Sequence, residues 1–156
     1  MRYQDILFEA IGAPVLYHGT SVDALMRILQ TDIIRGSKVD RGPHGVSLTR
    51  NMRIAREKAV LRGKGHHGGA ILLLDRDKLA RRYGRRLRPI DVLGIRGVSP
   101  ENPFTGVSEY EERLPGDLTN ARDYITRIVL TDPQSFAAFA ENNPAIDYAR
   151  ELFTDS

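Results

Sequence analysis

The segment Tyr17-His18-Gly19-Thr20 follows a short apolar run that begins at Val15. A histidine in this position lies at the end of a buried strand, with its ring near the mouth of a loop. Because Gly19 has no side chain, it lets another group approach the backbone closely. The imidazole is therefore either part of a binding site or a half-buried ring that hydrogen-bonds a nearby carbonyl.

A second polar segment, Val46-Ser47-Leu48-Thr49-Arg50, alternates apolar and polar residues. Side chains alternate between the two faces of a strand, so the hydroxyls of Ser47 and Thr49 share one face. Arg50 adds a planar guanidinium that is suited to phosphate. The pattern predicts either a strand whose polar face binds a ligand or an edge strand whose polar face is solvated.

Carboxylates are concentrated at residues 109–112. Glu109 and Glu111 share a face if this segment is a strand, and Glu112 points the other way. Neighbouring carboxylates repel each other, which raises one pKa or requires a cationic partner. In a cleft such a pair can stabilise a cation or abstract a proton, whereas on the surface it is a solvated acidic turn. A glycosidase pair fits poorly, since neighbours on one strand do not flank a sugar ring.

Basic residues are also unevenly distributed. Five arginines between residues 81 and 88 produce a positive field that attracts phosphate, or they pair with the acidic residues 109–112. His66-His67 lies in a glycine-rich loop, where adjacent histidines do not share a face, and we expect no metal site there. The sequence contains no HExxH, Walker A or GxGxxG motif, which argues against a zinc protease, a P-loop ATPase and a Rossmann site.

The elements that must position these residues follow from apolar spacing and turn residues. The pattern predicts an α+β fold in one domain, residues 1–156, because strands and helices do not alternate regularly. Ser21 and Asn51 are predicted to cap helices, and Pro133 to begin one. Helices are predicted over residues 2–11, after Ser21, over 52–62 and twice within 133–153, the last over about 144–153, with a short helix or turn over 75–83. Strands are predicted over residues 15–18, 45–49, 70–74, near 90–93, over 110–114 and over 124–130, with a turn at 19–21 and loops at 31–45, 63–69 and 84–108.

The composition is that of a soluble globular protein, with 156 residues of which 41% are hydrophobic and 28% charged. The longest apolar run, residues 70–74, is far shorter than the roughly 20 residues of a membrane span. The chain has no cysteine, which excludes disulfides, thiolate nucleophiles and cysteine zinc sites. We expect a cytoplasmic protein without a secretory signal and without membrane association.

Taken together, the polar segments resemble the three short motifs of the ADP-ribosyltransferase superfamily, in particular small bacterial or phage mono-ADP-ribosyltransferase domains. Tyr17-His18-Gly19-Thr20 resembles the histidine form of the first motif, which also occurs in RNA 2′-phosphotransferases and poly-ADP-ribose polymerases. Ser47-Leu48-Thr49 resembles the second motif, with threonine where serine is commoner. Glu109-Tyr110-Glu111, with Leu114 and Pro115 after it, resembles the third, although Glu112-Arg113 stands where two aliphatic residues are usual. The resemblance covers about residues 15–130 and implies a split, mostly antiparallel β core.

The resemblance implies NAD as co-substrate and a protein or nucleic acid as the acceptor of ADP-ribose. Glu111, four residues before Pro115, would stabilise positive charge on the ribose, and Glu109 would orient or deprotonate the acceptor. His18 would bind a ribose, Gly19 the nicotinamide amide, and Arg50 or the arginines of 81–88 the pyrophosphate. No metal is implied. The implied cofactor-binding residues are Tyr17, His18, Gly19, Thr20, Ser47, Thr49 and Arg50.

Two other functions remain open. The histidine motif and the basic loop would also suit an RNA 2′-phosphotransferase or a nucleic-acid-modifying member of the same fold, although an acidic third motif would repel phosphorylated RNA. A non-catalytic basic module that binds nucleic acid or protein would show affinity that falls steeply with salt and no response to NAD.

Overall fold

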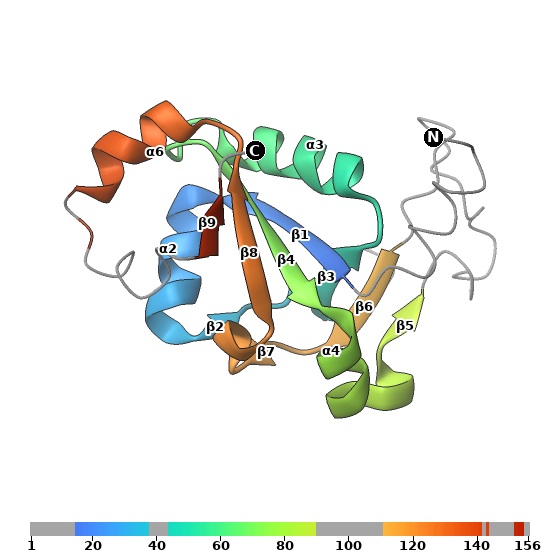
Figure 1. The fold of residues 1–156 in the computed structure, drawn as a ribbon. Helices are drawn as coiled ribbons and strands as arrows, with labels where there is room; N and C mark the ends of the chain where they lie inside the picture. Colours follow the sequence, from blue (N-terminus) through green and yellow to red (C-terminus); the bar gives the residue numbers. More distant parts are fainter. Residues whose placement is uncertain (1–14, 38–43, 90–110, 142, 144–151, 155–156) are drawn as a thin grey trace.

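The computed structural model describes residues 15–37, 44–89, 111–141, 143 and 152–154. Several predicted features therefore lie outside the described residues: the helix over 2–11, the strand near 90–93, Glu109, and most of the helix over 144–153. Within the described part, the chain has an α+β fold with a seven-stranded, mostly antiparallel sheet (Figure 1). This confirms the predicted fold class.

The main sheet has the strand order β5-β6-β3-β1-β4-β8-β9, and each neighbouring pair is antiparallel except β8 and β9. Its strands are β1 (Val15–Ser21), β3 (Gly45–Thr49), β4 (Gly69–Asp75), β5 (Arg88–Pro89), β6 (Glu111–Pro115), β8 (Ile125–Leu130) and β9 (Phe153–Thr154). A second, two-stranded sheet joins β2 (Ile33–Ile34) to β7 (Leu118–Thr119).

The helices begin where the sequence predicts caps. The Ser21 side chain accepts a hydrogen bond from the Ala24 amide at 3.1 Å, and the Asn51 side chain accepts one from the Arg53 amide at 2.9 Å. Each cap satisfies an amide that the first helical turn leaves without a partner. The helices are α2 (Val22–Thr31), α3 (Met52–Gly63), α4 (Arg76–Tyr83) and α6 (Pro133–Ala140), with 3₁₀ turns η1 (Gly84–Arg86) and η2 (Ala121–Asp123).

The central strands β1 and β4 bury both of their faces. Leu16 and Leu72 lie in the larger core with Leu25 of α2, whereas Ile71 packs with Ala55 and other residues of α3 in a smaller core. Side chains alternate along a strand, so His18 and Thr20 belong to the face of Leu16, and Tyr17 and Gly19 to the face that α3 covers. Burying each of these leucines contributes about 1.5–3 kcal/mol.

Residues 19–21, predicted as a turn, instead form the end of β1 and pair with residues 69–71 of β4. Gly19 is required by packing. A Cβ at this position would lie 2.2 Å from the main-chain oxygen of Ala55 in α3. The group that approaches Gly19 closely is therefore a helix.

Two further predictions need correction. The predicted loop over 31–45 contains the short strand β2, which pairs with β7. Phe153, predicted to end a helix, belongs to β9 and pairs in parallel with Ile128 of β8. Both pairings join segments far apart in the sequence, which local patterns do not reveal. Among the described residues, no helix has the length and apolarity needed to cross a membrane.

Candidate functional site

The strands β1 and β3 separate at the centre of the sheet. Their described register consists of the single pair Tyr17–Thr49. Beyond it, β1 continues along β4 to Ser21, while β3 continues along β6 to Gly45. Residues 19–21 and 45–47 therefore form the two arms of a fork.

Two side chains bind main-chain carbonyls in this fork. His18 Nδ1 lies 3.0 Å from the carbonyl oxygen of Ser47 on β3. Arg62 of α3 donates from Nη1 to the carbonyl oxygen of Gly19 on β1 at 2.6 Å. Buried carbonyls need partners, and here side chains replace part of the ladder between the strands. The interpretation of His18 as a half-buried ring on a nearby carbonyl is confirmed.

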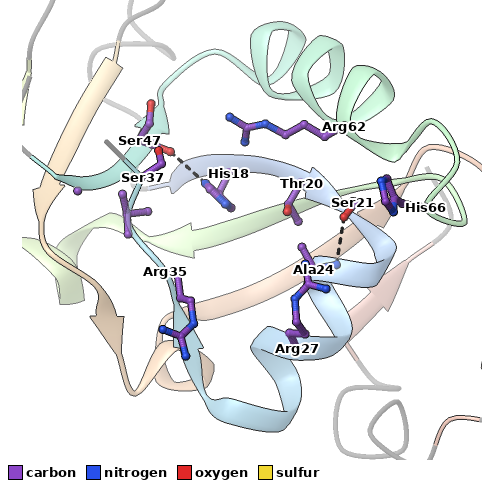
Figure 2. A pocket seen from close by; sticks show the side chains of 12 residues that line it. His18, Thr20, Ser21, Ala24, Arg27, Arg35, Ser37, Ser47, Arg62 and His66 are labelled. Carbon is purple, nitrogen blue, oxygen red and sulfur yellow. Dashed lines mark hydrogen bonds between the residues drawn. The ribbon is translucent and has the colours of Figure 1, made fainter. Parts of the chain in front are cut away.

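A cavity of about 460 Å³ opens at the fork. Figure 2 shows His18 and Thr20 of β1, Ser47 of β3 and Arg62 of α3 around it. A cavity of this size is typical of small-molecule sites. Its described lining contains no carboxylate and consists of His18, Thr20, Ser21, Ala24, Arg27, Arg35, Ser37, Gly45, Val46, Ser47, Arg62 and His66.

The surroundings of His18 keep its ring neutral. The pKa of His18 is lowered from 6.5 to about 4, mainly because burial desolvates the ring. The hydrogen bond to Ser47 raises this pKa, and the charges of Arg62 and Lys58 lower it. A carbonyl oxygen can only accept a hydrogen bond, so the proton of the neutral ring is on Nδ1. Nε2 therefore carries a lone pair that can accept a hydrogen bond from a ligand hydroxyl.

Positive charge reaches the cavity from three elements. Arg27 comes from α2, Arg35 from the segment after β2, and Arg62 from the end of α3 (Figure 2). Within the described part of the chain, the guanidinium groups of Arg27 and Arg35 make no hydrogen bond or ion pair. No local motif marks these three arginines, so the sequence alone does not predict their place at the cavity.

Two of the arginines predicted from the sequence to bind phosphate do not line the cavity. Arg82 donates to the carbonyl oxygen of Thr119 and lies over the rings of Tyr83 and Tyr124. Arg50 is buried, and it is not among the described residues that line the cavity. These contacts give Arg82 a structural role.

The predicted site residues divide into two groups. The cavity brings together His18, Thr20 and Ser47. Tyr17 instead packs in the smaller core under α3. The Thr49 hydroxyl is buried and accepts a hydrogen bond from the Asn51 amide at 3.0 Å, just before α3 begins.

The third motif can be described by its register. Glu111 is paired with Thr49, and Glu112 with Leu48. Leu48 lies in the larger core with Leu16, and thus on the sheet face of His18. The register position of Glu112 is therefore on the face of His18, and that of Glu111 is on the opposite face. Glu109 lies outside the described residues.

A cluster that the sequence did not predict borders the cavity. His66 Nδ1 lies 3.1 Å and His67 Nδ1 lies 2.7 Å from the two carboxylate oxygens of Asp23. Within the described ranges, no group of histidine and acidic residues has an arrangement that could hold a metal ion.

No protein-family model matches the chain, and no curated protein matches it.

Proposed function

We propose that the chain is an NAD-dependent mono-ADP-ribosyltransferase that acts on a macromolecular acceptor in the cytoplasm. One observation carries the proposal. The first two motifs, whose central residues His18 and Ser47 are 29 positions apart, meet at one cavity where β1 and β3 separate. A polar cavity in the middle of a sheet, next to a split in the strand ladder, provides a preformed site for a nucleotide.

The polar groups of the cavity suit the sugar of a dinucleotide. Nε2 of the neutral His18 ring can accept a hydrogen bond that a ribose hydroxyl donates. The hydroxyls of Thr20, Ser21 and Ser37 can both donate and accept. Together they offer partners for ribose hydroxyls on one side of the cavity.

The cationic groups of the cavity suit the pyrophosphate. Arg27, Arg35 and Arg62 line the same cavity, and none of the described residues that line it carries a carboxylate. Guanidinium groups bind phosphate oxygens in pairs through parallel hydrogen bonds. We therefore assign the pyrophosphate to these arginines in place of Arg50 and the arginines of 81–88.

NAD supplies an ADP-ribosyl group attached to a good leaving group, nicotinamide. A carboxylate near the ribose would stabilise the positive charge that develops when this bond breaks. Glu111 would take this role and Glu109 would orient the acceptor, as the resemblance implies; Glu112 is the alternative to Glu111, because its register position is on the sheet face of His18. Replacing the stabilising residue with glutamine should reduce NAD turnover about 10²–10³-fold, so Glu109→Gln, Glu111→Gln and Glu112→Gln are compared in one assay.

Thermal unfolding with and without NAD tests the proposal directly. NAD at ten times its Kd should stabilise the protein by about 1.4 kcal/mol, which raises the Tm by about 3–6 °C for a chain of this length. Arg35→Gln should reduce the shift. Arg81→Gln is the matched control, since Arg81 is an exposed arginine on α4 that does not line the cavity. If NAD does not raise the Tm of the wild-type protein, the proposal is contradicted. A non-catalytic binding module would give that result.

A second candidate function follows from the cationic lining. Three arginines without a described carboxylate would also suit a 2′-phosphate on RNA, as in an RNA 2′-phosphotransferase-like member of the same fold. Incubation with NAD and a 2′-phosphorylated oligonucleotide separates the two functions. Loss of the phosphate from the RNA identifies the phosphotransferase, whereas ADP-ribose found by mass spectrometry on unphosphorylated RNA or on protein identifies the ADP-ribosyltransferase.

A further inference from the structure

The turn between α3 and β4 directs two consecutive histidines to one carboxylate. His66 and His67 normally would point apart, yet their Nδ1 atoms lie 3.1 and 2.7 Å from the two oxygens of Asp23. His67 achieves this with a left-handed φ of 65°, between Gly65 at 73° and Gly68 at 92°. Such a backbone is uncommon for a residue with a side chain and persists only where the surrounding structure enforces it.

The two histidines differ in what they face. His66 lines the cavity that also contains His18 (Figure 2). His67 is not among the described lining residues, and its ring stacks on Phe139 with centroids 4.4 Å apart. His66 can therefore meet a molecule in the cavity, whereas His67 supports the turn.

The hydrogen bonds fix where the protons are. A carboxylate oxygen can only accept, so Nδ1 of each histidine donates to Asp23. Desolvation raises the pKa of Asp23, but the hydrogen bonds from His67 and His66 outweigh it and hold this pKa below its usual value. Asp23 is thus ionised at neutral pH. With Nδ1 of His66 donating to Asp23, the site left on this ring to accept a proton is Nε2.

We propose that His66 is the general base that activates the acceptor, with Asp23 as its positioning residue; this inference rests on the proposed ADP-ribosyltransferase function. A base whose ring is oriented by a carboxylate is a recurrent arrangement for activating a nucleophile. The acceptor O–H or N–H gives its proton to Nε2 of His66. The acceptor atom bonds to the ribose carbon, the bond to nicotinamide breaks with its electron pair going to the ring nitrogen, and His66 later releases the proton to water.

NAD hydrolysis, with water as the acceptor, tests this role without knowledge of the natural acceptor. His66→Gln should lower nicotinamide release about 10²-fold or more while the Tm shift produced by NAD is kept. His67→Gln is the matched control, because it removes the same kind of hydrogen bond to Asp23 from the neighbouring residue. It should change turnover less than about tenfold. Added imidazole should restore part of the turnover of His66→Ala, which a structural role would not allow.

Each outcome bears on a different claim. A wild-type protein that NAD does not stabilise contradicts the proposed function itself. If NAD stabilises the protein, equal turnover in His66→Gln and wild type refutes the role of His66 as general base. Equal losses of turnover in His66→Gln and His67→Gln refute it as well. Diethyl pyrocarbonate labelling gives a readout that needs no turnover: NAD should protect His66 and leave His67 reactive, and equal labelling of His66 with and without NAD overturns the inference.

Discussion

The neutral state of His18 makes the stability of the protein depend on pH. Its ring is half-buried beside the fork, and desolvation lowers its pKa from 6.5 to about 4. As the pH falls below 6.5, the unfolded chain binds a proton at His18 that the folded protein does not bind until about pH 4. Stability from this residue is therefore complete above pH 6.5 and is lost between pH 6.5 and 4.

The size of the effect follows from the two pKa values. The difference between 6.5 and about 4 corresponds to about 3 kcal/mol once both states are protonated. At pH 5 the folded ring is still mostly neutral while the unfolded one is mostly protonated, so the loss relative to pH 8 should be about 2 kcal/mol.

Urea unfolding of wild type and His18→Asn at pH 8, 7, 6 and 5 measures this contribution. The asparagine amide can keep the hydrogen bond to the Ser47 carbonyl but does not titrate. Other titrating groups act equally in both proteins, so they cancel in the difference. Between pH 8 and 5, wild type should lose about 2 kcal/mol more than the variant. Parallel losses in the two proteins would refute the assignment of a half-buried, neutral imidazole.

Three further predictions use the same unfolding measurement. Gly19→Ala should destabilise the fold by about 3 kcal/mol, because its Cβ would meet the main-chain oxygen of Ala55 at 2.2 Å; a loss under 1 kcal/mol would mean that α3 shifts freely. Ser21→Ala should cost about 1 kcal/mol through loss of the cap on α2, and an unchanged stability would show that water replaces the cap. The lowered pKa of Asp23 adds stability that is present above the unfolded pKa of 3.8 and lost as the pH falls through the folded pKa, so the gap between wild type and Asp23→Asn should narrow in acid. A gap that stays constant from pH 6 to 2 would contradict the hydrogen bonds to His66 and His67.

Local patterns were sufficient for the elements whose signals are local. The alternation of Val46, Leu48 and their polar neighbours predicts β3, and the apolar run of residues 70–74 predicts β4. Ser21 and Asn51 mark the starts of α2 and α3, because a capping side chain acts within three residues of its own position. The α+β class follows from the order of these elements.

Long-range pairing was beyond the reach of the sequence. Ile33 pairs with Thr119, and Ile128 with Phe153, and no local pattern specifies either contact. The sequence predicts both a turn at Gly19 and the close approach of another group to its backbone; the turn is wrong, and the group that approaches is α3. The same residue type serves both purposes, and only the packed helix distinguishes them.

The sequence predicts only part of the candidate site, because the rest depends on contacts between distant segments. His18 and Ser47 stand out because polar residues inside apolar strands need partners. Arg27, Arg35 and Arg62 are ordinary surface arginines in the sequence, and only the fold brings them to one cavity. The pair His66-His67 is visible in the sequence, but its shared carboxylate depends on a left-handed turn that the sequence does not specify.

The fork links the proposed ligand to a hydrogen bond that the protein already makes. Arg62 donates to the carbonyl oxygen of Gly19 at 2.6 Å, where a nicotinamide amide would need to donate instead. An amide that takes this position releases the guanidinium of Arg62 within the same cavity as Arg27 and Arg35. Because the guanidinium of Arg62 would then lack its carbonyl acceptor, the pyrophosphate of the same ligand can replace that acceptor. A ligand that carries both an amide and a pyrophosphate would therefore exchange one hydrogen bond for two, whereas nicotinamide alone would leave Arg62 without its acceptor.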